Sequence, residues 1–401
     1  MLQGKTIVLG VTGGIAVYKA ADIVSRLKKL DANVEVIMTE GAAEFVTPLT
    51  FQTLSNNQVH RKMFNEITNY DVEHISLAKK ADLVLIAPAT ANTIGKIANG
   101  IADNLLTTVV MATTAKVVFA PAMNTNMYRN PLVQENIAKL KRLGYEFIEP
   151  VKGRLACGDY GEGKMAEPQD IVEYIVRCFV EKDLVGKKIV VTAGPTIEPL
   201  DPVRYITNHS SGKMGYCIAK EAADRGAEVI LISGPTNLEA PKDVNLIRVK
   251  TTEDMLNAVG KYFDSCDVLI KAAAPVDFKP ENVSSTKIKK KKDSDELVIK
   301  YVKTPDIAAH FGKMKKHQIM VGFAAETNNL LEYAKEKLKE KNFDFIVAND
   351  VSKEGAGFNV DTNIVTIIEK NGEITNYPIM DKSQVAKIII DKVKNLLDNI
   401  G

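Results

Sequence analysis

Three side chains in the first half of the chain, Cys157, His74 and Asn124, have groups that could act on a substrate. Cys157 lies in a stretch rich in glycine and charge, residues 153–168, which predicts a loop. Such loops seldom hold buried structural thiols, but a thiol acts only where its surroundings tune its pKa. A lone helical histidine such as His74 is more often structural than catalytic. Asn124 follows a predicted strand and could hold a carboxylate or simply form a turn.

Small residues follow two other predicted strands in the same half. Gly13 and Gly14 end the first strand, where their N–H groups could reach a phosphate or simply form a tight turn. The turn lacks the G-x-G-x-x-G pattern, so a dinucleotide fingerprint is unsupported. Residues 88–93 could hydrogen-bond a flat heterocycle, or cap a helix through Asn92 or Thr93.

The second half carries cations and a carboxylate suited to phosphate chemistry. Residues 208–215 could hold a phosphate at a helix start, although they do not form a P-loop pattern. Asp277 follows a predicted strand, either facing a metal-bridged phosphate or exposed on a loop. The lysines among residues 287–292 could close over a triphosphate or form a solvated strand edge. Lys337 and Lys341 share one helical face, where lysines are usually solvated.

The composition excludes several classes of protein. Lys plus Arg number 52 and Asp plus Glu number 50, which argues against a protein that coats nucleic acid. No apolar run is long enough to span a bilayer, and the N-terminus lacks a signal-peptide pattern. The four cysteines lie far apart without metal-ligand spacing. These features predict a cytoplasmic protein that acts away from membranes.

The pattern of strands and helices that must position these residues occurs twice in the 401-residue chain. Residues 4–9 and 186–191 both begin Gly-Lys and run into an apolar strand, and a glycine-containing turn and a helix follow each. We therefore predict two Rossmann-like α/β domains, residues 1–185 and 186–401, with a seam near 183–186. Ligands of such doubly wound sheets bind beyond the carboxyl ends of the strands.

Two hairpins are predicted in the second domain. Alternating residues on both sides of 293–295 indicate a flap hairpin formed by 287–303. Asn371-Gly372 between two apolar runs indicates a type I′ hairpin near the C-terminus. In the first domain, residues 109–111 are apolar and fit a helix or a strand equally well.

The motifs of the first domain occur in a characteristic order. GVTGGIA, then His74, PATANT, PAMN and ACGDYGEGKMAEP follow one another. They resemble the flavin-dependent cysteine decarboxylases, specifically the N-terminal half of the bifunctional phosphopantothenoylcysteine decarboxylase/phosphopantothenate–cysteine ligases of coenzyme A synthesis. The resemblance implies a flavodoxin-like domain that binds FMN through Gly13, Gly14, Thr39, Ala89, Thr90, Ala91, Asn92 and Thr93.

The same resemblance implies catalytic roles in decarboxylation. His74 would be the catalytic histidine, Asn124 would bind the substrate carboxylate, and Cys157 would protonate the product enethiolate. Two positions depart from the family, which often has Trp where Tyr128 stands and Arg where Lys164 stands. Either departure could alter a subunit contact or phosphate binding, but neither removes a catalytic group.

The second domain resembles the ligase half of the same family. AGPTIEPLDPVRYITNHSSGKMG, AAAPVDF, KIKK, TPDI, GFAAET and ANDVS occur in order. The resemblance implies that CTP activates 4′-phosphopantothenate as an acyl-cytidylate, from which cysteine displaces CMP. Arg204 and Asn208 would belong to the phosphopantothenate site, and Asn208 would also be catalytic. Asp277 would bind Mg²⁺. The implied CTP contacts are Ala272, Ala273, Ala274, Asp277, Lys287, Pro305, Asp306, Ile307, Ala308, Phe323, Lys337 and Lys341.

The resulting prediction is a bifunctional enzyme that makes 4′-phosphopantetheine from 4′-phosphopantothenate, L-cysteine and CTP, with FMN and Mg²⁺ as cofactors. The family resemblance also implies a homo-oligomer, with a dodecamer of trimers joined by ligase dimers as the natural expectation. Two rival hypotheses are a catalytically silent flavoprotein that acts as a binding module, and a nicotinamide dehydrogenase. Retention of His74 and Cys157 argues against the first, and the missing dinucleotide fingerprint argues against the second.

Overall fold

The computed structural model describes residues 2–63, 72–155, 158–289, 297–326, 330–350, 357 and 360–400. The chain divides into two compact units, Met1–Val180 and Glu181–Gly401. The predicted seam at 183–186 falls just inside the second unit. None of the helices in the described ranges is long and apolar enough to cross a membrane.

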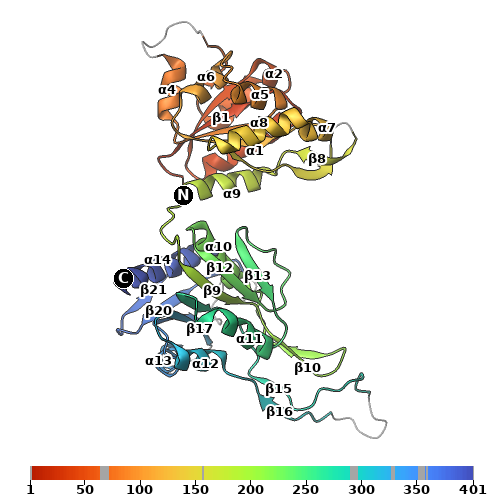
Figure 1. The fold of residues 1–401 in the computed structure, drawn as a ribbon. Coiled ribbons are helices and arrows are strands. Elements are labelled where there is room, and N and C mark those ends of the chain that lie inside the picture. Colours follow the sequence, from red (N-terminus) through yellow and green to blue (C-terminus); the bar gives the residue numbers. More distant parts are fainter. Residues whose placement is uncertain are drawn as a thin grey trace. The chain divides into compact units, whose positions relative to one another are not determined.

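The first unit is built on a six-stranded parallel sheet (Figure 1). The strand order is β3-β2-β1-β4-β5-β6, so the order reverses between β1 and β4. Ligands of doubly wound sheets bind at such a reversal. The strands are β1 Thr6–Val11, β2 Asn33–Met38, β3 Val59–His60, β4 Leu83–Ala89, β5 Lys116–Pro121 and β6 Glu146–Phe147.

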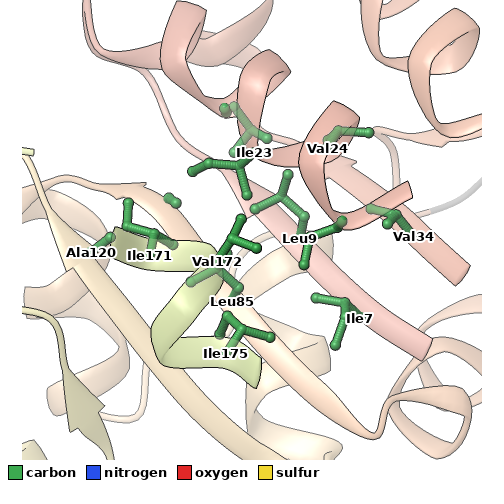
Figure 2. Close-up of a cluster of buried hydrophobic side chains, with 14 of the residues drawn as sticks. Ile7, Leu9, Ile23, Val24, Val34, Leu85, Ala120, Ile171, Val172 and Ile175 are labelled. Carbon is green, nitrogen blue, oxygen red and sulfur yellow. The ribbon is translucent and has the colours of Figure 1, made fainter. Parts of the chain in front are cut away.

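Helices cover both faces of this sheet, as expected for strands that are buried throughout. Figure 2 shows one face, where Ile23 of α1 lies near Leu9 of β1, and Ile171 of α9 lies near Ala120 of β5. The helices of that face are α1 Val17–Lys29, α3 Pro48–Ser55 and α9 Pro168–Cys178, with the short α2 Glu40–Ala43. The other face carries α4 Glu73–Lys80, α5 Ala91–Ala98, α6 Leu105–Ala112 and α8 Pro131–Arg142.

The second unit repeats this strand order and extends it. Its sheet runs β13-β12-β9-β14-β17-β18-β20-β21, with the reversal between β9 and β14 and an antiparallel hairpin at the end. The prediction of two Rossmann-like domains is confirmed. The strands are β9 Lys188–Ala193, β12 Glu228–Ser233, β13 Val244–Arg248, β14 Val268–Lys271, β17 Ile319–Glu326, β18 Phe345–Asp350, β20 Val365–Glu369 and β21 Ile374–Asn376.

Two helical layers and an ion-pair cluster hold the second unit together. α10 Lys213–Asp224 and α14 Lys382–Ile400 cover one face, and α11 Thr252–Phe263, α12 Ile307–Met314 and α13 Leu330–Glu340 cover the other (Figure 1). The buried guanidinium of Arg225, after α10, lies 2.5 Å from Asp183 and 2.5 Å from Asp391 of α14. It therefore ties the first residues of the unit to its last helix.

The loop predicted at residues 153–168 is wrong, because most of that stretch is a hairpin. β7 Val151–Arg154 and β8 Tyr160–Lys164 pair antiparallel. The glycines that suggested a loop instead allow close contact. A Cβ on Gly163, whose φ is +128°, would lie 2.3 Å from the carbonyl oxygen of Met123. Tight docking of the hairpin against the segment before α7 Thr125–Arg129 requires glycine there.

The flap prediction is wrong in its strand pairing. β16 Tyr301–Lys303 pairs antiparallel with β15 Phe278–Pro280, not with residues 287–289. Alternation predicts a strand but not its partner, and this partner is distant in sequence. The predicted turn at 293–295 lies outside the described residues.

The structure corrects the type of one turn that was predicted in the second unit. A type I′ turn needs positive φ at both central residues, and of Asn371 and Gly372 only Gly372 has it, at +92°. Gly372 N–H donates to Glu369 O, which fits a type I turn followed by a glycine bulge.

The ambiguous residues 109–111 of the first unit are helical, within α6. Two further antiparallel pairs are β10 Ile197–Pro199 with β11 Tyr205–Thr207, and β19 Thr362–Asn363 with β22 Met380–Asp381.

Candidate functional sites

The first unit has a cavity of about 1410 Å³ at the carboxyl ends of its central strands. Of the predicted flavin contacts, Ala89 is fully buried inside β4 and does not line the cavity. The others do line it: Gly13, Gly14, Thr39, Thr90, Ala91, Asn92 and Thr93. The structure therefore gathers these residues, which are distant in sequence, around one space.

Gly13 is required by close packing of the turn. A Cβ at Gly13 would lie 2.8 Å from the backbone carbon of Gly41, whereas one at Gly14 would meet only Thr90, at 3.8 Å. α1 begins after this turn, and its Val17 N–H donates to Gly14 O at 3.0 Å. The turn therefore presents backbone, without side-chain bulk, to the cavity.

A hydroxyl network fixes the start of α5. Thr90 is the helix N-cap and accepts a hydrogen bond from Thr93 N at 3.4 Å, so the predicted caps at Asn92 or Thr93 are wrong. Thr12 Oγ1 donates to Pro88 O at 2.7 Å and accepts from Thr90 N at 3.2 Å. Sequence reasoning missed Thr12, which is 1% exposed and joins the two turns of the cavity floor.

A buried cation beside the cavity was also missed. Lys19 is 7% exposed, and its Nζ donates to Met165 O at 3.3 Å and to Glu167 at 3.0 Å. Lys164, also at the cavity, pairs with the same carboxylate at 3.0 Å. The hydrogen bonds from Lys164 and Lys19 hold the pKa of Glu167 below its usual value. The only sequence signal was a lysine one residue after Tyr18 in an otherwise apolar helix start.

Asn124 lies where the β7–β8 hairpin approaches the cavity. It caps α7 by accepting from Asn126 N at 2.8 Å, and its Nδ2 donates to Asp159 at 3.4 Å. Asn124 lines the cavity, so both its predicted turn role and an open position for a ligand are present. Leu155 N–H donates to Asp159 O at 2.8 Å and closes the hairpin tip. Cys157 itself lies outside the described residues.

His74 and Tyr128 lie away from the cavity lining. His74 is half-buried in the first turn of α4 and is not among the residues that line the cavity. Tyr128 donates to Glu149 at 2.8 Å, and burial followed by this hydrogen bond raises the pKa of the phenol. Within the described part of a single chain, Asn124 therefore lines the cavity and His74 does not.

The second unit places its predicted residues around the loop after β14. Asn208 Nδ2 donates to Pro275 O at 2.9 Å and to Ala274 O at 3.4 Å. The carbonyl of Asp277 accepts from Thr304 N at 2.9 Å. These bonds join Asn208, residues 272–277 and the segment before α12. Residues 272–277 and 305–308 together contain eight of the twelve predicted nucleotide contacts.

Two charged side chains at this edge, Asp306 and Lys341, are paired with each other. Asp306 caps α12 by accepting from Ala309 N at 2.9 Å, and it forms an ion pair with Lys341. Burial alone would raise the pKa of Asp306, but the hydrogen bonds from Ala309 and Lys341 outweigh it and lower that pKa. Lys337 is half-buried on α13 nearby in sequence, and Phe323 is partly buried in β17.

Arg204 holds the beginning of the predicted flap. Its guanidinium lies 2.6 Å from Asp201 and donates to Ile288 O at 2.8 Å, and Ile288 N donates back to Asp201 at 3.1 Å. We call these three residues the flap clasp. The Asp201 side chain is fully buried, and the Arg204 hydrogen bond holds the pKa of its carboxyl well below the usual range. Lys287, beside the clasp, is exposed.

The glycine- and serine-rich segment 208–215 lies beside a smaller cavity of about 710 Å³. Ser210, Ser211 and Arg248 line it, whereas Lys213 pairs with Asp361 at 2.6 Å. Among the described residues, no group of three or more acidic, His or Cys side chains could hold a metal by itself. A lone Asp277 fits Mg²⁺ held mainly by phosphate oxygens.

The comparisons with known proteins match this division. Residues 1–180 match the family described as Flavoprotein, and residues 184–397 match the family described as DNA/pantothenate metabolism flavoprotein C-terminal domain. The chain is thus a flavoprotein domain followed by a domain of that second family. It belongs to the family of coenzyme A biosynthesis bifunctional proteins, as its full-length relatives show.

Two curated relatives and one solved structure illustrate the similarity. The coenzyme A biosynthesis bifunctional protein CoaBC of Bacillus subtilis (strain 168) is 49% identical, covering 100% of this chain and 99% of that protein. The protein of the same name from Escherichia coli (strain K12) is 44% identical, covering 99% and 98%. The crystal structure of the C-terminal domain of a coenzyme A biosynthesis bifunctional protein CoaBC is 44% identical, with a TM-score of 0.47, covering 55% of this chain and 100% of that one.

Proposed function

We propose that this chain makes 4′-phosphopantetheine in two steps, first joining 4′-phosphopantothenate to L-cysteine with CTP and then decarboxylating the product. The observation that carries the proposal is the full-length match to bifunctional relatives, in which both family regions are present in order. The two strand-order reversals supply one candidate site for each step.

The decarboxylation step belongs to the cavity of the first unit. FMN fits there, since the turn at Gly13 leaves room for a ligand and Thr39, Thr90 and Asn92 offer small polar groups to a flat ring. Bound flavin supplies the electron sink that a plain cysteine carboxylate lacks. Asn124 at the rim would bind the substrate carboxylate, and Cys157 would donate the proton that completes the product.

His74 needs a different placement to act on the same substrate. It does not line the cavity of its own chain in the described structure. A histidine supplied by a neighbouring copy would satisfy both the predicted role and the observed position. We therefore propose a homo-oligomer in which the decarboxylase site is completed between subunits, with a dodecamer as the expected assembly.

The ligation step belongs to the edge between β9 and β14. A carboxylate resists attack by an amine until it carries a good leaving group, which CTP provides as CMP. Lys287, Lys337 and Lys341 would neutralise the phosphates, and Asp277 would share a Mg²⁺ with them. Arg204 and Asn208 would orient phosphopantothenate, for which the cavity lined by Ser210 and Ser211 offers space.

The proposal is tested with purified full-length protein. It should carry bound flavin, and it should release CO₂ only when phosphopantothenate, cysteine and CTP are all supplied. Supplied phosphopantothenoylcysteine should be decarboxylated without CTP. Bound flavin with neither activity would favour a silent flavoprotein that serves as a binding module, and NAD-dependent hydride transfer would favour a dehydrogenase. The protein should act in the cytoplasm, where these substrates would be made.

Two variants separate the roles within the decarboxylase step. Cys157→Ser should still release CO₂ but fail to form finished product, because the proton is needed after CO₂ has left. His74→Asn should stop the reaction before CO₂ release. Normal 4′-phosphopantetheine formation by Cys157→Ser would remove that thiol from the mechanism.

A further inference from the structure

Lys271 is a buried cation that neither the strand pattern nor the family motifs account for. It is the last residue of β14, the strand at the reversal of the second sheet, and is 8% exposed. Its neighbours in register are Thr192 of β9 and Gly322 of β17, neither of which is charged. Within the described part of the chain its ammonium has no hydrogen bond and no ion pair. A charged residue with so little exposure and no partner is costly, so this position requires an explanation.

The charged groups that act on Lys271 come from three surrounding segments. They are Asp277 in the loop after β14, Asp306 at the start of α12 and Lys341 just after α13. β9 and β17 contribute only Thr192 and Gly322 at this level. Lys271 therefore lies within electrostatic reach of the side chains to which the nucleotide is assigned.

The electrostatics of this group favour a further anion. Burial lowers the pKa of Lys271 to about 8, with Asp306 and Asp277 opposing the shift and Lys341 adding to it. Asp306 already pairs directly with Lys341 and caps α12, so its charge is largely compensated. An incoming polyanion would stabilise the charged form of Lys271 without first breaking an ion pair.

We propose that Lys271 is an additional phosphate-binding residue that contacts the phosphate chain of the nucleoside triphosphate from the strand end. This inference rests on the proposed ligase function. Lys341 must exchange its ion pair with Asp306 for a phosphate, whereas Lys271 has no partner to give up. The competing explanation is that Lys271 merely fills space with its aliphatic stem, as buried lysines can.

Lys271→Met separates the two explanations, because methionine keeps the stem and removes the charge. Binding of CTP and of CMP to the full-length flavin-loaded protein would be measured by calorimetry near pH 8. One lost charge-assisted contact should weaken CTP binding about tenfold, while CMP, which lacks the outer phosphates, should bind almost as before. Lys188→Met removes the same charge at the opposite end of β9 and should leave CTP binding unchanged.

A second measurement starts from the unaltered protein. If CTP binding recharges Lys271, the unaltered protein should take up protons near pH 8, where a free triphosphate is already fully ionised. The binding enthalpy should then differ between buffers of low and high ionisation enthalpy, and Lys271→Met should remove that difference. This readout still tests the inference if the variant does not fold, which retained flavin and a thermal transition would reveal.

Several outcomes would overturn the inference. They are CTP binding by Lys271→Met at the parent's affinity, an equal weakening for CTP and CMP, or no proton uptake in the parent. If the parent itself fails to bind CTP, the proposed ligase function fails, and this inference fails with it. A parent that binds CTP and ligates normally while Lys271→Met does the same leaves the function intact and assigns Lys271 to packing.

Discussion

The two units use the same strand order, yet their reversal points differ in chemistry. In the first unit the edge opens into a cavity of about 1410 Å³ whose predicted ligand contacts are glycines, hydroxyls and an amide. In the second unit the corresponding edge carries Lys341, Asp306, Lys271 and Asp277. A flat ring is recognised mainly by shape, and a phosphate chain mainly by charge.

The difference predicts two modes of binding. The proposed flavin site is formed before its ligand arrives, because Thr12, Thr90 and Gly13 are fixed by contacts inside the unit. The proposed nucleotide site holds Lys341 in an ion pair with Asp306 that must be exchanged, so part of the gain from that phosphate contact offsets the loss of the internal pair. Four substitutions test this contrast.

The largest effect should come from Arg225→Met. The substitution leaves Asp183 and Asp391 without their shared guanidinium. Breaking a buried ion pair typically costs about 3–5 kcal/mol, so the second unit should lose most of its stability. In calorimetry, the unfolding transition of the second unit should move to a lower temperature, while flavin stays bound to the first unit.

The matched control is Lys279→Met, which removes an exposed partner of Glu253 and should change stability by less than about 0.5 kcal/mol. Release of flavin together with unfolding of the second unit would show that the two units do not fold independently, and the comparison between them would lose its basis.

Gly13→Ala should damage the preformed site. The added Cβ meets the backbone of Gly41 at 2.8 Å, and overpacking of this kind costs about 1–3 kcal/mol. The purified variant should lose flavin absorbance and decarboxylation, whereas ligation should continue. Gly14→Ala adds the same methyl group with an ordinary 3.8 Å contact to Thr90 and should keep the fold of the unit intact. Equal flavin binding by Gly13→Ala and the parent would contradict a site fixed by shape.

Lys341→Gln should weaken CTP binding by a smaller amount than a free lysine would suggest. A charge-assisted phosphate contact is worth roughly 1.5–3 kcal/mol, and the exchange of the Asp306 pair offsets part of it. We expect CTP affinity to fall by less than about tenfold, with decarboxylation of supplied phosphopantothenoylcysteine unchanged. Asn208→Ala should keep CTP affinity and lose conjugate formation. Unchanged CTP use by Lys341→Gln and by Lys287→Gln would show that neither lysine contacts CTP.

The smallest effect concerns acid pH and Asp201. The hydrogen bonds from Arg204 and Ile288 hold the folded-state pKa of Asp201 below the unfolded value of about 3.9. The stabilisation is therefore complete above that value and is lost as the pH falls toward the folded-state pKa. The difference in urea midpoint between the parent and Asp201→Asn should shrink as the pH drops below about 4. A difference independent of pH would mean that the carboxylate charge contributes nothing.

Much of the fold followed from local patterns. The two βαβ series were predictable because apolar periodicity and glycine turns recur within each, and both sheets have the predicted parallel core. Pairing between distant segments was not predictable, as β15 and β16 illustrate. The β7–β8 hairpin was mistaken for a loop because Gly153, Gly161 and Gly163 look like breakers, whereas the structure uses Gly161 and Gly163 for close contact with α7 and the segment before it.

The candidate sites were predictable where polar residues follow strands, as with Asn92 and Asp277. Residues whose types are ordinary for their positions were missed. Lys271 looks like the polar end of an apolar strand, and Thr12 and Lys19 look like ordinary turn and helix residues. Only the structure places their polar groups beside a cavity or a charged cluster. Spacing along the chain carries no information about which strand end faces which helix.

The flap clasp has a consequence for chain entropy. The connection between β15 and β16 would otherwise be one long loop, but Asp201 and Arg204 hold it at Ile288, and Ser284 N–H also donates to Leu200 O at 3.0 Å. Loop-closure cost rises with the logarithm of length, by about 0.6 kcal/mol for each doubling. Lys287 is one residue from the fixed position at Ile288, so its ammonium can move only over a short distance. This raises its effective concentration near any nearby anion. The chain on either side of Lys287, at Ser284 and at Ile288, is thus already held when the protein folds.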